Sequence, residues 1–386
     1  MSVAYWQDAS AAQPVCEVDI LIVGAGIAGW SVAYWLRDEG LSVAVLDRGD
    51  RCAGATGRNA GFATCGSVEH YARQVAKHGP ELARELWALS EENLRLLRKE
   101  LVDRGVECDF VQRGTYSLAG GAHELEELAR SAELMASEGI RVSMVDEAHV
   151  REHLGARGFA GGALYHDDGE LHPVKLVTGM AERSGAAFYP HHEVHRMEQG
   201  PDGVDVWTQR RRFRAQAVVL ATNGYSYLLD PWFADRIYPT RGQIIVTEPA
   251  PPFLAAPCYA NFVLDYFRQL PDGRVLIGGF RQLAKETEVG SADEPNPVIQ
   301  AALEAFLEEH FEALHGKRIE YRWAGIMGFS VDGVPLIGSL PGKPSVYFVG
   351  GFTAHGIGFA FKAGQLTARL ITRGEAPGPL SARRLR

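Results

Sequence analysis

Hydrophobic positions near the N-terminus change their period at a cluster of glycines. Residues 20–23 form a continuous apolar run after Asp19, as in a buried strand, and residues 27–36 follow without a charge, as in a closely packed helix. Another apolar run, 41–46, predicts the next strand. Strand, glycine turn, helix and strand in this order predict a βαβ unit, the building block of a parallel sheet.

Helical and strand periods alternate along the rest of the chain. Helices are predicted at 80–104, 123–138, from Pro173 onward, at 295–314 and at about 356–372. Strands are predicted at 108–118, 187–197, 204–207, 217–222, 243–247, 262–269, 274–278, 334–337 and 346–349. The pattern between residues 241 and 280 is typical of antiparallel strands joined by turns.

These segments predict an α/β fold with two domains that share the chain discontinuously. Parallel βα patterns occur at both ends and in the middle, and antiparallel patterns are interleaved between them. We expect a dinucleotide-binding domain built from 1–80, 146–226 and 325–386. An α+β domain with an antiparallel sheet, built from 81–145 and 227–324, would bind the substrate. A chain of 386 residues is long enough for two such cores.

Composition and charge narrow the class of protein. With 46% hydrophobic and 23% charged residues, the sequence is typical of a globular protein. A net charge of −9 gives no basic surface for nucleic acid or anionic lipid. The five cysteines have the spacing of neither a disulfide framework nor a zinc site, and the first residues lack a signal-peptide pattern. We therefore expect a cytoplasmic protein without a bound metal.

A membrane span is an alternative for the first apolar segment, because residues 20–36 contain no charge. A spanning helix needs about 20 apolar residues, however, and does not usually place three glycines at a turn. The charged residues Arg37, Asp38 and Glu39 follow directly. We therefore expect no membrane span.

Gly24, Gly26 and Gly29 have the spacing of a dinucleotide-binding turn. Gly24 allows a tight turn, Gly26 lets the backbone approach a pyrophosphate, and Gly29 lets helix and strand pack closely. Free N–H groups and the positive end of the helix would hold the phosphates. Asp47, at the end of the second strand, would accept hydrogen bonds from the hydroxyl groups of an adenosine ribose.

A second glycine-rich loop, residues 350–358, joins a predicted strand to the closing helix. Such a loop again offers backbone N–H groups and a helix N-terminus to an anion or a carbonyl group. Two such sites at opposite ends of the chain fit one long ligand, such as FAD. The alternative is that these glycines form only a packing turn.

Five motifs in this order resemble the FAD-dependent oxidoreductases of the D-amino-acid-oxidase superfamily. They are the Gly24–Asp47 unit, residues 54–61, 220–224 and 332–338, and the loop 350–356. The resemblance covers nearly the whole chain and implies a Rossmann-like FAD-binding domain of the glutathione-reductase type. Glycine oxidase and sarcosine oxidase are among the members. Tyr5 and Trp6, followed by a Gly-Arg-Asn-x-Gly loop, are most similar to the gamma-glutamylputrescine oxidase branch.

The resemblance implies roles for individual residues. Arg58, Asn59 and Gly61 would line the passage from pyrophosphate to flavin, Val194 would present its backbone to the adenine, and the loop 351–356 would face the flavin N1/C2=O edge. The expected cofactor-binding residues are Gly24, Gly26, Ile27, Ala28, Gly29, Asp47, Arg48, Thr56, Gly57, Arg58, Asn59, Ala60, Gly61, Val194, Ala221, Thr222, Asn223, Gly224, Gly325, Gly351, Phe352, Thr353, Ala354, His355 and Gly356.

One departure from the family pattern concerns the substrate. Amino-acid-oxidising relatives have an arginine, five residues before the Asp of the Asp-Gly-x-Pro motif, that binds the substrate carboxylate with its two-pronged fork. That position is Met327 here, which favours an amine over a plain α-amino acid. The alternative is that Met327 packs in the core and that Arg241 or Arg268 binds a carboxylate.

Two further departures concern the flavin. The position of the flavin-linked cysteine of sarcosine oxidases corresponds to Gly325, so we expect FAD to be held without a covalent bond; Cys52 and Cys65 near the phosphate loop are the alternatives. The position of their oxygen-activating lysine corresponds to Ile277. Oxygen is the expected electron acceptor, and this departure leaves another acceptor open.

Together these features predict an FAD-dependent amine oxidoreductase. The C–H bond beside a primary or secondary amine would give a hydride to flavin N5, and the imine would be hydrolysed. His355 is a candidate donor to the reduced ring, with a purely structural role as its alternative, and Tyr266, Phe267 and Phe329 are candidates for docking the substrate. The other interpretations are oxidation of a D-amino acid, glycine or an N-methyl amino acid, a non-catalytic FAD-bearing subunit of a larger complex, and NAD as the main cofactor.

Overall fold

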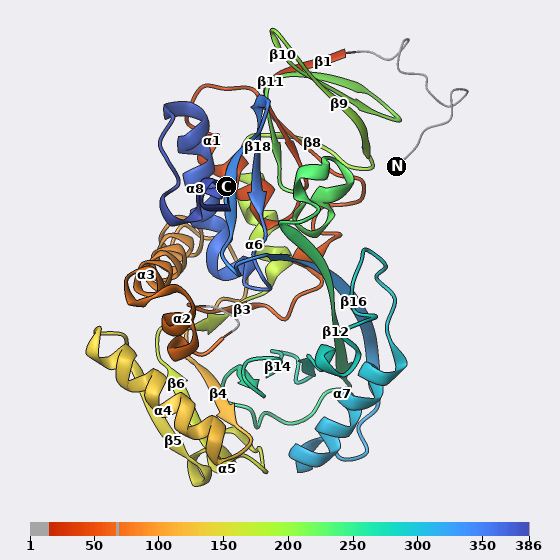
Figure 1. Cartoon of the computed structure of the whole chain (residues 1–386). Coiled ribbons are helices and arrows are strands. Elements are labelled where there is room, and N and C mark those ends of the chain that lie inside the picture. The colour runs from red at the N-terminus through yellow and green to blue at the C-terminus, as the bar shows by residue number, and fades with distance from the viewer. Residues whose placement is uncertain (1–14, 67–68, 386) are drawn as a thin grey trace.

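The structure is a computed structural model that describes residues 15–66 and 69–385. It contains two large sheets, one in the upper and one in the lower half of Figure 1, with helices packed against each. Two long strands of the second sheet, β12 (Ile237–Thr247) and β16 (Ile319–Ser330), reach up toward the first sheet. The motif residues Tyr5 and Trp6 lie outside the described residues.

The first sheet is mainly parallel and has the strand order β17-β18-β11-β1-β2-β8. Its strands are β1 (Val15–Val23), β2 (Val43–Leu46), β8 (Ala187–Tyr189), β11 (Arg212–Leu220), β17 (Leu336–Leu340) and β18 (Lys343–Gly350), and β11 also pairs with the hairpin of β9 (Val194–Gly200) and β10 (Gly203–Thr208). Because β1 is parallel to β2 and to β11, the carboxyl ends of these strands meet at one edge of the sheet. Ligands bind at that edge in open α/β sheets.

Both faces of β1 are buried, which explains its continuous apolar run. Ile20 and Ile22 pack in a core with four helices, whereas Leu21 and Val23 pack in a second core with the β9–β10 hairpin. The four helices are α1 (Ile27–Leu36), α3 (Pro80–Leu97), α6 (Pro173–Glu182) and α8 (Gly356–Arg373).

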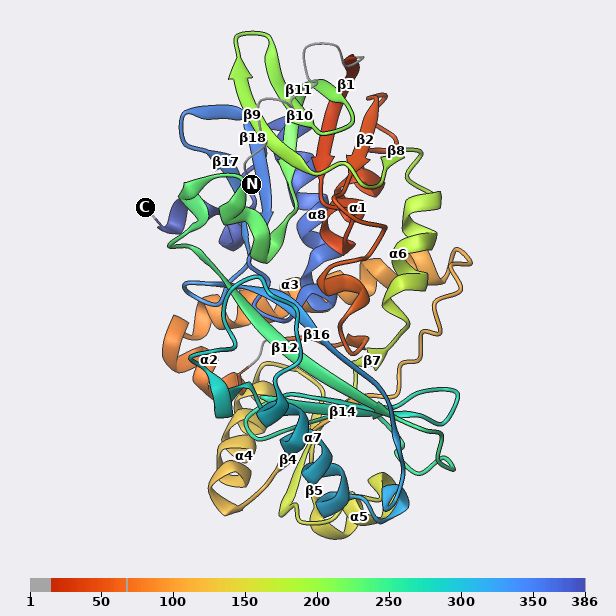
Figure 2. The same ribbon diagram turned by 90° about the vertical axis from the view of Figure 1, so that its right-hand side faces the viewer.

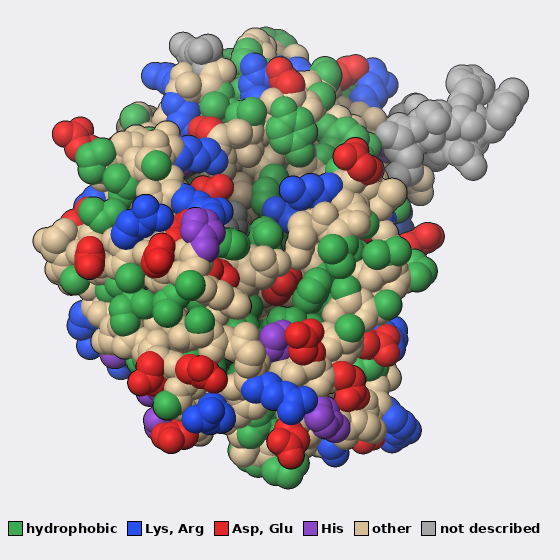
Figure 3. Space-filling view, turned by 60° about the horizontal axis from the view of Figure 1, so that its bottom comes forward, with side chains coloured by type: hydrophobic (Ala, Val, Ile, Leu, Met, Phe, Trp, Pro, Cys, Tyr) green, Lys and Arg blue, Asp and Glu red, His purple; other side chains and the backbone are tan. Residues whose placement is uncertain are grey.

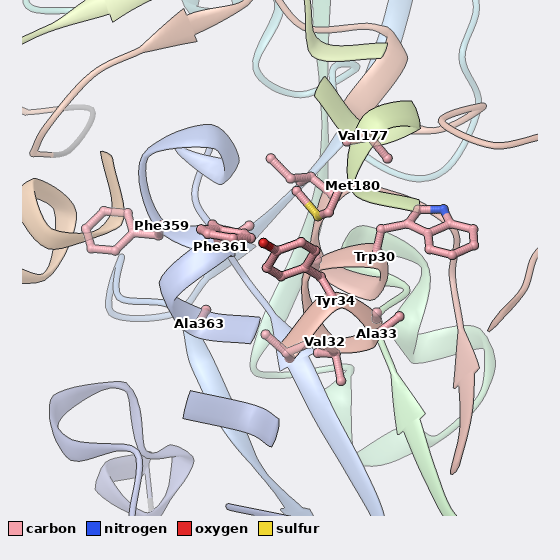
Figure 4. Packing of buried hydrophobic residues seen from close by; sticks show 14 of the residues in the cluster. Trp30, Val32, Ala33, Tyr34, Val177, Met180, Phe359, Phe361 and Ala363 are labelled. Carbon is pink, nitrogen blue, oxygen red and sulfur yellow. The ribbon is translucent and has the colours of Figure 1, made fainter. Parts of the chain in front are cut away.

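Aromatic side chains hold the helices together. Figure 4 shows Tyr34 of α1 among Phe361 of α8 and Met180 of α6. The ring centroids of Tyr34 and Phe361 are 5.3 Å apart. Helices α1 and α8 approach closely because Gly364 has no side chain; a Cβ there would lie 2.5 Å from the Cβ of Ser31. The first and last helices of the nucleotide half therefore form one packed unit.

The second sheet has the strand order β16-β12-β15-β14-β13-β4-β6-β5 and is antiparallel except between β13 and β4. The remaining strands are β4 (Thr115–Ala119), β5 (Val142–Asp146), β6 (Gly161–Tyr165), β13 (Cys258–Ala260), β14 (Asp265–Gln269) and β15 (Val275–Gly278). Helices α4 (Ala122–Ser137), α5 (Glu147–Leu154) and α7 (Pro297–His310) lie beside it in Figure 2. Helix α2 (Tyr71–His78) and a small sheet of β3 (Phe62–Ala63) with β7 (Gly169–Glu170) complete the fold.

Several predicted strands have different bounds in the structure. The predicted strand 108–118 forms a strand only from Thr115. The predicted strand 187–197 divides in two, because β8 pairs with β2 whereas β9 turns into the hairpin with β10. The strand predicted at 262–269 begins at Asp265, since Phe262 and Val263 have positive φ angles of 55° and 67°. Local apolar runs do not reveal such turns, because bulky residues rarely adopt positive φ.

The long strand β16 was absent from the predicted elements. Gly325 and Gly328 interrupt its pattern, and glycine usually weakens a strand. Both glycines are required by close neighbours: a Cβ would lie 2.9 Å from the Cβ of Arg58 at Gly325, and 2.5 Å from the amide oxygen of Asn223 at Gly328. The first predicted long helix also ends early, because α3 passes into a π-helix at Arg98–Val102.

The architecture confirms the predicted α/β fold with an antiparallel second part. The exact domain bounds stay a prediction. Strand pairing bears on the boundary expected between residues 145 and 146. Strand β6 (Gly161–Tyr165) lies in the second sheet, although residues from 146 onward were expected in the first domain. In the described part of the chain, no helix is long and apolar enough to cross a membrane.

Candidate active site

A cavity of about 480 Å³ is lined by residues of both sheets. The first sheet and its helices contribute Gly24 and Ile27, and the second contributes Tyr259, Tyr266 and Met327. The strand ends at the edge of the parallel sheet thus open toward a wall of antiparallel strands. Such a position, between two structural units, is typical of a cofactor and substrate site.

The glycine turn after β1 has the close contacts that its spacing predicts. Gly24 has a φ of 115°, and a Cβ there would lie 2.6 Å from the carbonyl oxygen of Ala221. At Gly29 a Cβ would lie 1.9 Å from the Gly24 carbonyl oxygen, which only glycine permits. Gly26, Ile27 and their neighbour Ala28 at the start of α1 line the cavity. The N-terminus of α1, with no acidic residue in its first turn, therefore faces the cavity and would favour an anionic group there.

Thr56 completes this helix start from a distant loop. Its hydroxyl accepts a hydrogen bond from the Ile27 N–H at 2.9 Å, and it would lie 2.9 Å from a Cβ on Gly26. The helix itself has no side-chain cap at Gly26. Thr56 thus satisfies one helical N–H and leaves the others at this turn for the phosphates.

Asp47 lines the cavity and also holds the surrounding backbone. One carboxylate oxygen accepts a hydrogen bond from the Ala25 N–H at 2.8 Å, and the other accepts one from the Gly49 N–H at 2.9 Å. Burial raises the pKa of Asp47, and these N–H groups act in the opposite direction. Each oxygen keeps a second lone pair, so the carboxylate remains suited to ribose hydroxyl groups.

Arg58 and Asn59 line the cavity, but their side chains brace the loop that carries them. The Arg58 guanidinium donates to the Ala324 carbonyl of β16 at 2.7 Å and pairs with Asp293 at 2.9 Å. The Asn59 amide donates to the Thr56 carbonyl at 2.7 Å and accepts from the Gly61 N–H at 2.7 Å. These contacts fix the loop between the two sheets.

Val194, Ala221, Thr222 and Arg48 form another part of the wall near the glycine turn. The guanidinium of Arg48 lies over the ring of Tyr225, 4.2 Å from its centroid. Val194 begins β9, directly after the turn that follows β8. The apolar side chains of Val194 and Ala221 suit contact with a flat ring such as adenine.

The second glycine-rich loop is anchored to both sheets. The Asn223 side-chain oxygen accepts a hydrogen bond from the Gly351 N–H at 3.0 Å, and the Gly328 carbonyl accepts one from the Thr353 N–H at 2.9 Å. Thr353 and Ala354 have φ angles of 48° and 65°. This strained turn brings the start of α8 to the cavity, where Gly356, Ile357 and Gly358 form part of the wall.

His355 is buried at the end of this loop and lines the cavity. Burial lowers the pKa of His355 to about 4, so the imidazole is neutral near pH 7. Its ring is stacked on Tyr259, with centroids 6.4 Å apart. A neutral imidazole is able to donate one hydrogen bond to a ligand without adding charge.

The candidate substrate residues do not all meet at the cavity. Tyr266, Met327 and Phe329 line it, whereas Phe267 is part of the second core. Arg241 and Arg268 do not line it either.

Both of these arginines are committed elsewhere. Arg241 donates to both carboxylate oxygens of Glu288, at 3.1 and 2.9 Å, and to two backbone carbonyls. Arg268 donates to the Gly61 carbonyl at 3.1 Å and to Glu170 at 3.4 Å. The structure gives neither arginine a free edge in the cavity.

Some expected cofactor residues stand behind the wall instead of on it. Those outside the cavity lining are Gly29, Gly57, Gly224, Gly351 and Thr353. Each allows or makes a close backbone contact; a Cβ on Gly57 would lie 2.4 Å from the Cys52 carbonyl, and one on Gly224 would lie 2.9 Å from the Met327 carbonyl. These close contacts shape the loops that line the cavity.

The structure adds wall residues that the sequence did not suggest. They include Phe62, Thr64, His192, Glu193, Tyr225, Tyr259, Val263, Leu264, Arg281 and Asp293. The last five belong to the second sheet or to its loops, and no motif marks them. For Arg281 the only sequence signal is that it follows Gly278-Gly279-Phe280 at the end of a predicted strand.

The five cysteines are all free thiols, and none lines the cavity. Burial raises the pKa of Cys52 to about 12 and also raises the pKa of Cys65. Both thiols are therefore protonated, and neither residue lines the cavity. This supports a cofactor held by non-covalent contacts.

As a whole, the wall fits a long dinucleotide. Two helix N-termini, at residues 26 and 356, face one cavity, and Asp47 lies beside the first. The glycines leave space where a side chain would block the backbone from phosphates. A simple mononucleotide would use only one of the two helix ends.

Comparison with known proteins gives the same assignment. The model of the family described as "FAD dependent oxidoreductase" matches residues 19–370. Gamma-glutamylputrescine oxidoreductase from Escherichia coli is 28% identical over 93% of this chain and 84% of its own. Glycine oxidase from Geobacillus kaustophilus is 24% identical over 92% and 93% of the two chains. The crystal structure of that glycine oxidase superposes with a TM-score of 0.81, covering 95% of this chain and 98% of its own at 22% identity, and shows the same fold.

Proposed function

The chain belongs to the FAD-dependent oxidoreductase family, with FAD as its cofactor, and we propose that it oxidises the CH–NH bond of a primary or secondary amine. The observation that carries this proposal is the cavity wall beyond the dinucleotide turn. There an apolar and aromatic surface, with Tyr259, Tyr266, Met327 and Phe329, faces the loop that ends at His355. Such a surface suits an uncharged amine held against a flat ring.

The bound flavin supplies the hydride acceptor, and few acid or base side chains are needed. The chain's own residues bind, orient and desolvate the substrate. Burial raises the pKa of both Tyr259 and Tyr266, so both phenols stay neutral. The neutral His355 likewise adds no charge. These groups disfavour an ammonium ion and thus favour the neutral amine, which is the form that gives up a hydride.

The start of α8 would act on the flavin itself. Its free N–H groups at Gly356 to Gly358 line the cavity, and no acidic residue occurs in its first turn. The positive end of a helix stabilises negative charge nearby, which favours the reduced ring. His355, next to these groups, would donate one hydrogen bond at the same edge.

The alternatives differ in substrate and in partners. The E. coli relative is named for gamma-glutamylputrescine and the Geobacillus relative for glycine, so both an amine and an amino acid remain candidates. A non-catalytic role would be marked by a flavin that no amine reduces. We further propose oxygen as the electron acceptor. We also propose the cytoplasm as the location, because the free cysteines are typical of a reducing compartment.

Surface charge argues against a polyanionic partner. Acidic and basic side chains are interspersed on the face in Figure 3, and the net charge is −9. A nucleic-acid surface would gather basic side chains on one face.

Anaerobic mixing with a panel of amines and amino acids tests the proposed reaction. We expect a subset to bleach the flavin absorbance, with peroxide formed when air is admitted. If none bleaches the flavin while dithionite does, the enzymatic proposal is wrong.

A matched pair of glycine variants tests the cofactor site. Gly29→Ala places a Cβ 1.9 Å from the Gly24 carbonyl, and we expect it to purify without bound FAD. Gly121→Ala, at the start of α4, meets no atom within 4 Å and should keep its FAD. Equal FAD content in the two variants would contradict the assigned turn.

A further inference from the structure

We propose that Arg281 binds a carboxylate of the substrate, so that the amine oxidised by this chain is one that carries an acidic group. The proposal rests on the proposed amine oxidation and names its substrate class. Arg281 begins a short helix (Arg281–Ala284) just after β15 and lines the cavity together with Tyr266, Met327 and Phe329.

Arg281 is not neutralised by the protein. Among the described residues, no carboxylate lies within the 4.0 Å of an ion pair from its guanidinium, and the side chain donates no hydrogen bond to them. Arg58, the other arginine close to this part of the wall, is paired with Asp293 at 2.9 Å. Arg281 therefore presents an uncompensated positive charge to the cavity.

The surroundings of Arg281 make an unpaired positive charge energetically unfavourable. Arg281 is partly buried at the cavity wall, and burial lowers the pKa of its guanidinium. An arginine still stays charged at neutral pH, because its reference pKa is above 12. A partly buried charge without a partner is unfavourable, and an anionic ligand would reduce the penalty.

The geometry leaves the binding edge of the guanidinium free. Its carbon lies 4.2 Å from the centroid of the Phe329 ring, so the ring covers one flat face. The N–H groups of a guanidinium lie in its plane and point away from such a stacked ring. They are the groups that take a carboxylate with two parallel hydrogen bonds.

A row of aromatic rings leads from His355 to this arginine. Tyr259 stacks on His355 at 6.4 Å, Phe62 lies 4.9 Å from Tyr259, and Tyr266 lies 6.0 Å from Phe62, measured between ring centroids. Tyr266 ends the row, and the positive charge of Arg281 acts to lower the pKa of its phenol, against the larger effect of burial. The anionic group of the substrate would therefore lie at the end of the row away from the α8 loop.

Met327 leaves β16 without a positive charge at this part of the cavity, so that the charge comes from Arg281. It lies on the same face of β16 as Phe329, two residues along, and its terminal methyl group packs against Gly242; a Cβ there would lie 2.9 Å away. The strand itself thus supplies an apolar wall, and the loop after β15 supplies the positive charge.

Acid and amide pairs test this without assuming a natural substrate. Butyrate and butyramide have the same shape, and their binding is followed by the change in the flavin absorption spectrum of the FAD-loaded protein. We expect butyrate to bind at least tenfold more tightly than butyramide. Equal affinity for the two would overturn the proposal.

Three variants assign the preference to Arg281. In Arg281→Met the ratio of the affinities for butyrate and butyramide should fall to about one. Arg281→Lys should keep part of the preference for butyrate, because the positive charge remains. Arg318→Met is the control, since Arg318 is exposed and paired with Glu248 outside the cavity. Unchanged preference in an FAD-loaded Arg281→Met would overturn the proposal, and so would an equal loss in Arg318→Met.

Turnover links the site to the reaction. The kcat/KM for 4-aminobutyrate, or for glycine, should exceed that for its amide in the wild-type protein, and this ratio should approach one in Arg281→Met. If no amine reduces the flavin, the proposed reaction fails while the butyrate measurement still decides the role of Arg281. If amides are oxidised as well as acids, the reaction stands and the carboxylate site is refuted.

Discussion

The side-chain oxygen of Asn223 accepts a hydrogen bond from the Gly351 N–H at 3.0 Å, across a separation of 128 residues. This contact joins the loop after β11 to the loop before α8. Asn223 also has a φ of 46°, a conformation that asparagine tolerates better than most residues. One side-chain amide thus joins two segments of the cavity region that are far apart in the sequence.

Replacement of Asn223 should weaken FAD binding. Asn223→Ala leaves the buried Gly351 N–H without an acceptor, which costs about 1–3 kcal/mol, and places alanine at positive φ. We expect the dissociation constant for FAD to rise about tenfold, measured by titration of the apoprotein with FAD. Asn223→Gly loses the same hydrogen bond but accepts the backbone angle, so its thermal stability should lie between wild type and Asn223→Ala. Wild-type FAD affinity in both variants would contradict this role.

Thr56 should matter to the cofactor through its hydroxyl group. Thr56→Val preserves the shape and removes the acceptor for the Ile27 N–H at the start of α1. A lost helix cap costs about 1 kcal/mol, so we expect a lower melting temperature and a several-fold weaker FAD affinity. Thr56→Ser keeps the hydroxyl and serves as the control. The two variants would behave alike if the hydroxyl had no such role.

His355 should make the protein less stable in acid. Its pKa in the folded state, about 4, is below the value near 6.5 of an unfolded chain. On acidification from pH 6.5 toward 4 the unfolded state gains a proton that the folded state does not, so stability falls by on the order of 3 kcal/mol. His355→Gln should lose less stability over this range in urea unfolding at several pH values. Parallel pH profiles for wild type and variant would show that the histidine is not held neutral.

Asp168 should produce the opposite trend. It is buried, accepts hydrogen bonds from the Cys65 N–H at 2.8 Å and from the Thr115 hydroxyl, and burial raises its pKa to about 7. Between the unfolded pKa near 4 and pH 7 the folded state holds the proton more tightly, so stability falls as the pH rises.

A pair of asparagine variants isolates this effect. From pH 5 to pH 8, wild type should lose on the order of 3 kcal/mol relative to Asp168→Asn, which has no proton to lose. The neighbouring Asp167 is 43% exposed and pairs with Arg141, so Asp167→Asn should follow the wild-type profile. A flat difference between wild type and Asp168→Asn would refute the raised pKa.

The cofactor half was predictable because its determinants are close together in the sequence. Gly24, Gly26 and Gly29 act within one turn, and Asp47 ends the next strand, so spacing alone places them. The structure adds the reason for each glycine in the form of a specific backbone contact. Thr56 shows where prediction from local spacing ends, because its hydrogen bond with the Ile27 N–H depends on how a separate loop folds back.

The substrate half was less predictable because it depends on which polar groups find partners. Arg241 and Arg268 were reasonable candidates from their place in the chain, yet Glu288 and Glu170 engage them. Among the described residues, Arg281 has neither an ion pair nor a hydrogen bond to a protein group, and it lines the cavity in a short segment with no motif. The bounds of β12 and β16 were also missed, because their pairing with each other, not the local pattern, extends them.

The sequence by itself determined the cofactor class, the α/β fold and the substitution of Met327 for a charged residue, because these follow from local spacing and from single positions. Only the tertiary structure decided which charge faces the substrate. An arginine in a sequence has no partner until the chain folds, and pairing with a distant carboxylate or the absence of one decides whether it is structural or free to bind. In this chain that decision separates Arg241 and Arg268 from Arg281.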